Sequence, residues 1–493
     1  MLSLWNKAVG RDLRVIARHP ISEQNQLIFK VFAATLLLSI FAAIAFDAYY
    51  VAGVPVVLLL TYLTIVDFRK VFFFLIICIP LSTEFYFPNG LATDLPTEPL
   101  MIGLMGVYGI YVLRHGREMD SNFIRHPLAL LLLLHIFWIF TTTITSSLFL
   151  VSLKFSLAKL WYVVTFFFLA GSILKKEKDF KVFFWCILIP LLSTIFIIWI
   201  QHAALGFSFK SVGAVLGPFY RNHVNYASLL ALFIPFVWFA RQWYPKNSFK
   251  RWVLNFSLAV LLMAIQLSYT RTAYVTLFLA IGAYFVIRLK LVRFVLAASV
   301  IALFAAFAYM AKNNTYLQFA PDYERTVTHY KFDNLVSATV EMKDISTMER
   351  FYRWIAGMRM AKDKLVTGYG PGNFYNFYKP YTVSSFRTYV SDNPEKSGIH
   401  SYFLLVLVEQ GIFGMFIFIG LSFYALIMGQ RVYHESSDPI RKSIVMGVLL
   451  SLVVINAFLL INDMIETDKM GSFFFIGLAV LINADLANKK LKN

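Results

Sequence analysis

Apolar runs of bilayer length recur along almost the whole of the 493-residue sequence. A helix needs about 17–25 mainly apolar residues to cross the hydrocarbon core of a membrane, where its backbone groups must bond one another because water is absent. Hydrophobic residues make up 59% of the chain and charged residues 15%, against about 25% charged residues in soluble domains. The sequence therefore predicts an all-α, polytopic transmembrane helical bundle.

Fourteen hydrophobic segments can be delimited, and because several are short and a pair could be half-helices, we expect 12–14 spans. They lie at 27–46, 51–66, 71–87, 98–113, 127–147, 156–173, 182–200, 223–240, 252–268, 272–287, 292–311, 400–428, 443–461 and 471–487. Residues 1–26 are polar and basic, which does not fit a cleavable signal peptide. Cys78 and Cys186 lie in apolar runs, a pattern that favours neither a disulfide framework nor a zinc site.

The distribution of Lys and Arg predicts the orientation in the membrane. If the N-terminus is cytoplasmic and each segment crosses once, 27 basic residues fall on the inside, and 6 fall in the short outer loops and helix mouths. Basic residues concentrate in cytoplasmic loops of membrane proteins. We therefore expect both termini in the cytoplasm. The net charge of +18 needs no nucleic-acid partner to explain it.

One long hydrophilic region divides the chain into three predicted parts. These are an N-terminal transmembrane bundle (1–311), an extracytoplasmic loop (312–399) and C-terminal transmembrane helices (400–493). The loop contains MERFYRWIAGMRMAKDKLV, which places apolar residues at near-helical spacing, and then the turn-rich GYGPGNF. A loop of this length with its own helical pattern favours a small helical cap over a linker.

Two arginines stand at the outer membrane level in this orientation. Arg221 lies in GPFYRNHVNYAS, and Arg271 lies in SYTRT, a break of about four residues between two spans. Each could be structural, either beside a capped helix start at Asn222 or Asn225, or with its guanidinium at the lipid headgroups. Together, however, two guanidiniums could bind a diphosphate through bidentate hydrogen bonds. A diphosphate on a lipid carrier would lie at that depth.

His400 stands at the same level, where the outer loop re-enters the membrane. An imidazole with a pKa near its ordinary value of about 6.5 can take up or release a proton near neutrality, although a lone histidine is more often hydrogen-bonded to a carbonyl group. Glu409 lies nine residues further, inside LLVLVEQGIFG. On one straight helix the two side chains would project from roughly opposite faces, so Glu409 reads as an intramembrane polar contact.

Two further features belong to the outer side. The glycines of GYGPGN (368–373) do not fit the strand–turn–helix context of a phosphate-binding loop, and we interpret them as a rigid turn that positions the cap. Asp463 and Glu466 form an acidic outer turn. A metal site would need more converging carboxylates, so we expect these two to pair with an arginine of the cap and we expect no metal.

The ordered set GPFYRNHVNYAS, SYTRTAYV, RFYRW followed by LVTGYGPGNF, and HSYFLLVLVEQGIFG resembles the O-antigen ligase/polymerase superfamily. The likeness covers about residues 210–430. It implies a metal-independent, inverting glycosyltransferase of the GT-C type, without a cofactor, that uses an undecaprenyl-diphosphate-linked glycan as donor. It implies diphosphate binding by Arg221 and Arg271 and activation of the acceptor hydroxyl by His400. Arg350 and Arg353, and Glu409, are possible donor or acceptor contacts.

The resemblance implies a multi-pass protein of the bacterial inner (plasma) membrane, with lipid A–core as the first choice of acceptor. Two rivals use the same chemistry: a repeat-unit (O-antigen or exopolysaccharide) polymerase and a protein O-oligosaccharyltransferase. A third, of another class, is a lipid-linked sugar transporter or flippase. A transporter should place its polar residues near the bilayer midplane, whereas here they gather at the outer level.

Overall fold

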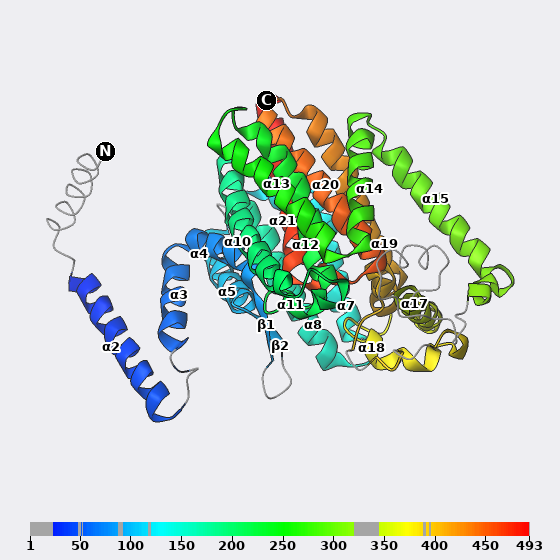
Figure 1. The fold of residues 1–493 in the computed structure, drawn as a ribbon, viewed down its shortest axis with the longest axis horizontal. Coiled ribbons are helices and arrows are strands. Elements are labelled where there is room, and N and C mark those ends of the chain that lie inside the picture. The colour runs from blue at the N-terminus through cyan, green and yellow to red at the C-terminus, as the bar shows by residue number, and fades with distance from the viewer. Residues whose placement is uncertain are drawn as a thin grey trace. The chain divides into compact units, whose positions relative to one another are not determined.

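The computed structural model describes residues 23–47, 51, 53–86, 92–116, 120–319, 345–387, 391–393 and 396–492. The chain divides into two compact units, residues 1–71 and 72–493. The residues described in each unit are mostly helical (Figure 1). In the described residues, ten helices are long and apolar enough to cross a membrane, and 29–45 and 54–66 are shorter apolar helices. The predicted all-α polytopic bundle is confirmed.

The first unit contains α2 (Glu23–Ala45), which packs against α3 (Val54–Val66). Both helices carry exposed apolar side chains such as Leu37, Phe41 and Ile65. Aliphatic and aromatic groups on the outer face are what a helix surrounded by lipid requires.

The helices of the second unit follow the predicted apolar segments closely. Its main helices are α5 (Thr97–His115), α7 (Pro127–Ile144), α8 (Phe149–Val163), α9 (Ala170–Ile173), α10 (Glu177–Ala204), α12 (His223–Ala240), α13 (Phe249–Ser268), α14 (Arg271–Arg288), α15 (Val292–Ala311), α17 (Ile345–Asp363), α19 (Tyr402–Glu435), α20 (Pro439–Ile461) and α21 (Asp468–Lys492). Short helices are α6 (Ser121–Ile124), α11 (Val212–Val215) and α18 (Phe374–Phe377), and α4 (Phe68–Cys78) runs across the boundary of the two units. A π-helical stretch, Val164–Leu169, joins α8 and α9 into one span.

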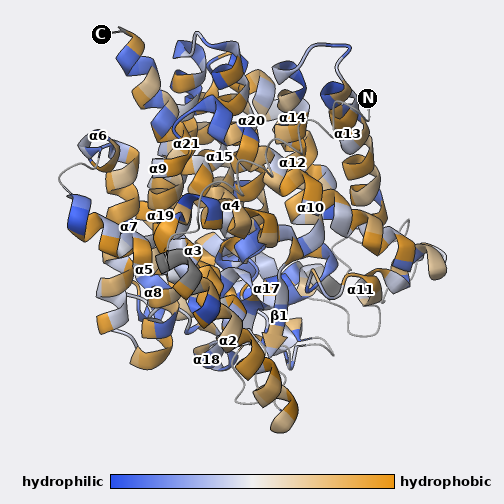
Figure 2. Cartoon of the chain, turned by 90° about the vertical axis from the view of Figure 1, so that its left-hand side faces the viewer, coloured by the Kyte–Doolittle hydropathy of each residue, from blue (hydrophilic) through white to orange (hydrophobic). Residues whose placement is uncertain are grey.

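The core of the second unit is made by α12, α20 and α21, which are the most buried spans. Phenylalanines join them: Phe233 and Phe236 of α12 contact Phe473 of α21. In contrast, α14 and α15 turn large apolar side chains such as Phe278 and Phe304 outward. Figure 2 shows hydrophobic residues along the long helices and hydrophilic ones at α17 and at the helix ends. This pattern fits a bundle whose sides face lipid and whose ends face water.

The segment predicted at 71–87 is not a single span. Helix α4 ends at Cys78, and a 3₁₀ turn (Ile79–Leu81) containing Pro80 follows. Strand β1 (Thr83–Tyr86) then pairs antiparallel with β2 (Ala92–Leu95), with Thr83 opposite Leu95. Proline has no N–H to continue a helix, and strand pairing supplies the backbone bonds beyond it. The prediction was wrong here because apolar content alone does not distinguish a helix from a short hairpin.

The predicted cap is partly described. Lys312–Phe319 form a 3₁₀ turn, and residues 320–344, 388–390 and 394–395 lie outside the described residues. The helix predicted from MERFYRWIAGMRMAKDKLV is confirmed as α17, which packs against α19. In Figure 1, α17 and α18 lie at the end of the bundle opposite the C-terminus. We call this the α17 end.

Helix α19 is broken at Gly411, whose backbone has φ 71° and ψ −173°. A Cβ at this position would come within 2.0 Å of the carbonyl oxygen of Val366, so only glycine fits. The groups released by the break find other partners. The Ile412 N–H donates to the Leu365 carbonyl at 2.8 Å, and the indole N–H of Trp138 in α7 donates to the Gln410 carbonyl at 2.8 Å.

The loop after α17 is bonded to the first half of α19. The N–H groups of Tyr369 and Gly370 donate to the carbonyls of Val408 and Glu409 at 3.0 and 2.9 Å. The Glu409 carboxylate accepts the N–H groups of Gly372 at 2.8 Å and Phe374 at 2.9 Å. GYGPGN is therefore a turn, as the sequence predicted. The structure adds that this turn is seated on a membrane helix and that the Glu409 side chain holds it.

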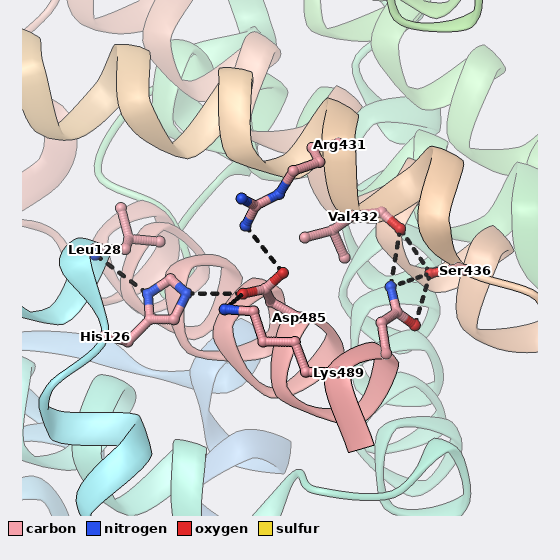
Figure 3. Close-up of polar contacts among 8 residues, drawn as sticks. His126, Leu128, Arg431, Val432, Ser436, Asp485 and Lys489 are labelled. Atoms are coloured by element: carbon pink, nitrogen blue, oxygen red, sulfur yellow. Dashed lines mark hydrogen bonds and ion pairs between the residues drawn. The ribbon is translucent and has the colours of Figure 1, made fainter. Parts of the chain in front are cut away.

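A buried carboxylate ties the opposite end of the bundle together. Figure 3 shows Asp485 of α21 with three partners: His126 at 3.2 Å, Arg431 at 3.0 Å and Lys489 at 2.7 Å. The Nδ1 atom of His126 accepts the Leu128 N–H. The ring proton is therefore on Nε2, which donates a hydrogen bond to Asp485. The start of α7 and helix α19 thus meet at one fully buried side chain of α21.

We expect the Asp485→Ala substitution to lower the free energy of unfolding by about 1–3 kcal/mol, because it leaves the buried His126 N–H without its acceptor, whereas the half-exposed Arg431 and Lys489 can be solvated. The measurement is the unfolding of the purified protein in mixed micelles. The matched control is Asp392→Ala, which removes an exposed ion pair with Arg387 and should change stability by less than about 1 kcal/mol. Equal effects of the two substitutions would contradict the anchoring role of Asp485.

Candidate functional site

The sequence places Arg271 at the amino terminus of a membrane helix, and the fold sets this terminus beside another. Helices α13 and α14 are joined by Tyr269 and Thr270 alone, with Tyr269 in the left-handed region at φ 52°. The Thr270 hydroxyl donates to the carbonyl of His223, the first residue of α12, at 3.2 Å. Arg271 and His223 therefore stand at neighbouring helix ends, at the α17 end of the bundle.

Helix α17 adds a second guanidinium to this pair. Arg350 is close enough to both His223 and His400 to interact with them electrostatically, and Arg271 acts on His223 in the same way. All four side chains are half-buried. We call His223, Arg271, Arg350 and His400 the basic cluster. Residues about 180 positions apart in the sequence thus share one positive site, which suits an anion with several oxygens.

His400 is held in an uncommon backbone conformation at the edge of this cluster. Its φ of 58° lies in the left-handed region, and its carbonyl accepts the indole N–H of Trp354 at 3.3 Å. Burial, followed by the positive charges of Arg353 and Arg350, lowers the pKa of His400 to about 3. The imidazole is therefore neutral at physiological pH and has a lone pair that can accept a proton.

Arg353 lies one turn from Arg350 but has a different environment. It is buried, and it donates from Nη1 to the Gly398 carbonyl at 3.0 Å and from Nη2 to Glu349 at 3.3 Å. The Ser391 hydroxyl bonds the other oxygen of Glu349. Arg353 thus fastens α17 to the chain that leads into His400 and adds positive charge beside that ring, whereas Arg350 acts on both His400 and His223.

Arg221 lies against the β1–β2 hairpin. Its Nε is 4.0 Å from a carboxylate oxygen of Glu84, and its side chain is 57% exposed. Asn222 caps α12 by accepting the N–H groups of Val224 and Asn225, both at 3.0 Å, which confirms the predicted cap. The next residue, His223, is the one that meets Arg271 and Arg350. Sequence reasoning missed it, although its place directly after the cap set it at the level of Arg271.

The acidic turn predicted at 463–466 lies beside the chain that leads into His400, since a Cβ on Gly398 would come within 1.8 Å of an Asp463 oxygen. Burial raises the pKa of the Asp463 carboxyl, and the neighbouring backbone N–H groups of Asp463 and His400 and the positive charge of Arg353 oppose this rise. Glu466 pairs instead with Lys159 of α8 at 2.5 Å, and Lys159 also donates to the Tyr402 hydroxyl at 3.4 Å.

Comparison with known families identifies part of the chain. Residues 256–419 match the family model described as O-antigen ligase. The match begins within α13 and ends within α19, so it contains Arg271, Arg350, His400 and Glu409. The resemblance drawn from the motifs is thereby confirmed. A search of curated proteins found no match.

Proposed function

Because the chain carries an O-antigen ligase domain that includes Arg271, Arg350 and His400, we propose that it moves a glycan from undecaprenyl diphosphate to lipid A–core. The observation that carries the proposal is the basic cluster, in which a neutral imidazole stands beside guanidinium groups. An inverting transfer needs these two elements: a base for the acceptor and positive charge for the departing diphosphate.

In the proposed reaction, an acceptor hydroxyl attacks the anomeric carbon of the donor from the face opposite the diphosphate. A new glycosidic C–O bond forms while the bond between the anomeric carbon and the phosphate oxygen breaks. His400 takes the hydroxyl proton, and undecaprenyl diphosphate leaves with the bonding electron pair. Arg271 and Arg350 bind the phosphate oxygens and stabilise the negative charge that grows on them.

Arg221 is the second diphosphate ligand implied by the family resemblance, and it keeps that role in the proposal. Its pairing with Glu84 is long, at 4.0 Å, and the Arg221 side chain is 57% exposed, so an anionic ligand could compete for the guanidinium. Its position on the chain just before His223 keeps it near the basic cluster. The contribution of Arg221 is separable from that of Arg271 by substituting each alone.

The proposed orientation places both termini in the cytoplasm of a bacterium and the α17 end in the periplasm. Its support is the excess of 27 basic residues over 6 counted along the sequence. A lipid-linked donor then lies with its polyprenyl chain beside the membrane helices and its headgroup at the basic cluster. Accessibility labelling of single cysteines at the α17 end and at residue 489 tests this orientation.

The test of function is a reconstituted transfer assay. It uses purified protein, undecaprenyl-diphosphate glycan, and three acceptors offered separately: lipid A–core, a lipid-linked repeat unit and a Ser/Thr-rich protein. Product on lipid A–core alone supports the proposal. Product on the repeat unit or on the protein indicates a polymerase or a protein glycosyltransferase. Movement of donor across the bilayer without any product would indicate a transporter and overturn the proposal.

We expect a chelator to leave transfer intact, because the guanidinium groups supply the positive charge that a divalent ion provides in metal-dependent transferases. The measurement is the initial rate with and without EDTA, after the protein and donor have been passed through chelating resin. Loss of activity with EDTA and its recovery with Mg²⁺ would contradict the metal-independent mechanism.

A further inference from the structure

The carboxyl group of Glu409 is buried in α19, and each of its oxygens has a partner in the turn that follows α17. Oε2 accepts the Gly372 N–H at 2.8 Å, and Oε1 accepts the Phe374 N–H at 2.9 Å. Glu409 is 3% exposed. An ionisable group inside a membrane helix is costly to bury, so the groups that it contacts indicate its role. These contacts favour a role within the protein over the donor or acceptor contact considered from the sequence.

The same turn is bonded on its other side to the junction of α7 and α8. The Asn373 side chain donates from Nδ2 to the hydroxyls of Ser146 and Ser152, at 2.9 and 3.0 Å. The Ser152 hydroxyl donates to the Pro371 carbonyl at 2.8 Å. Gly370, at φ 93°, allows this approach, because a Cβ there would lie 2.2 Å from the Ser146 hydroxyl oxygen. The turn is therefore a fixed point between α19 and the start of α8.

Helix α17 is attached to α19 at two levels. In the middle of α17, the indole N–H of Trp354 donates to the His400 carbonyl at 3.3 Å. Just past the end of α17, the Leu365 carbonyl accepts the Ile412 N–H at 2.8 Å, and the turn held by Glu409 follows. A stiff helix that is attached at one level can tilt about that point, whereas a second attachment fixes its direction.

We infer that Glu409 is a positioning residue: through the GYGPGN turn it fixes the direction of α17, the helix that holds the His400 carbonyl and carries Arg350. Without the carboxylate, two N–H groups of the turn lose their acceptor and regain one only by moving toward water. The kinetic consequence of the inference rests on the proposed function, whereas its structural part can be tested without transfer.

The main experiment compares Glu409→Ala with Gln410→Ala in the full-length, reconstituted protein. Gln410 is the matched control, since it is the next residue of α19, is 1% exposed, and has its side chain bonded to His135 of α7 at 3.1 Å. We expect Glu409→Ala to lower kcat/KM for donor by about 10–100-fold, because a displacement of about 1 Å in a reacting site has this effect. Gln410→Ala should stay within about threefold of the wild type. Equal losses would indicate lost packing alone and overturn the inference.

A second substitution, Glu409→Gln, keeps the shape of the side chain. A carboxamide offers one acceptor oxygen, and its NH₂ group faces the remaining N–H of the turn as a second donor. We therefore expect a loss of about 3–10-fold, between those of the wild type and Glu409→Ala. Wild-type kinetics in Glu409→Gln would contradict the need for two acceptors. This variant also carries the test if Glu409→Ala does not accumulate.

Amide hydrogen exchange of the purified protein in mixed micelles tests the structural part directly. An amide exchanges when its hydrogen bond opens, so a peptide containing Gly372 and Phe374 reports on the contact with Glu409. We expect these amides to exchange at least about tenfold faster in Glu409→Ala, and within about twofold of the wild-type rate in Gln410→Ala. Unchanged exchange in Glu409→Ala would overturn the inference.

The pH profile distinguishes a displaced α17 from a general loss of stability. Burial and the charges of Arg353 and Arg350 on α17 lower the pKa of His400, and Asp463 lies beside the chain leading into His400. If α17 tilts away, the pKa of His400 rises toward its ordinary value, and the acid limb of kcat/KM moves to higher pH. We expect this movement in Glu409→Ala but not in Gln410→Ala, and its absence from both would contradict the inference. Retained transfer in His400→Ala would instead contradict the proposed base, and amide exchange would then decide the positioning role.

Discussion

Glycan transfer is expected to fall by about 10²–10³-fold or more when Arg271 is replaced by alanine, with protein level and membrane insertion unchanged. The guanidinium begins α14 beside His223 and shares the basic cluster with Arg350. Removing one preorganised donor to a developing anion typically costs a factor of this size. Arg271→Lys should recover only part of the rate, because an ammonium group cannot make the bidentate contact. The measurement is the single-turnover rate with saturating acceptor.

The matched control for this substitution lies on the same helix. Arg288 ends α14 at the opposite end of the bundle, where it contacts the Tyr284 hydroxyl at 3.0 Å. Arg288→Ala removes one positive charge from the same helix by the same substitution, and it should leave the rate of transfer within about twofold of the wild type. Wild-type activity and donor affinity in Arg271→Ala would contradict the proposed binding of phosphate by Arg271. A parallel Arg350→Ala variant tests whether α17 contributes the second guanidinium.

Replacing His400 by alanine is expected to reduce kcat by about 10²–10⁴-fold, the usual contribution of a positioned general base. Donor binding should remain, because the arginines proposed to bind the diphosphate are intact. Equilibrium binding of donor and the rate of transfer are therefore measured on the same preparation. A variant that simply fails to bind donor would contradict the assignment of a base and favour a binding role for the imidazole.

The pH dependence offers a second check on His400. A base works in its unprotonated form, so activity is lost as the pH falls through its pKa, and a lowered pKa moves that loss to lower pH. With the pKa of His400 at about 3, kcat/KM should show no loss near pH 6.5 on the acid side. In the proposed complex the bound diphosphate would offset the charge of Arg350, so the acid limb of kcat should lie at higher pH than that of kcat/KM. An acid limb of kcat/KM near pH 6.5 would contradict this description.

The sequence was sufficient for the parts of the site that depend on helix ends. Apolar runs separated by very short polar breaks force a residue such as Arg271 to the mouth of its helix, and the return of the long loop does the same for His400. The α17 helix was also predictable from its own periodicity. These features depend on the local pattern of apolar residues and on the length of each apolar run relative to the thickness of the membrane. Both can be read from the sequence.

Neighbours set by the packing of distant elements were not predictable. The sequence suggested that Arg221 and Arg271 act as a pair. In the structure Arg221 lies against Glu84, in a hairpin whose first strand falls within the span predicted at 71–87. Arg350 and Arg353 looked equivalent in a basic-aromatic stretch, but Arg353 is bonded to the Gly398 carbonyl and to Glu349, whereas Arg350 also acts on His223. Such distinctions depend on which side of α17 meets α19, and no single periodicity encodes the choice.

The break at Gly411 has a consequence for how the protein is made. Backbone groups around the break are completed by Leu365 and Trp138, so the first turns of α19 cannot satisfy their hydrogen bonds alone within lipid. In the folded protein, the backbone bonds of this helix are therefore complete only when the chain after α17 and helix α7 are packed against it. The assembly of α19 is then a docking event as well as an insertion.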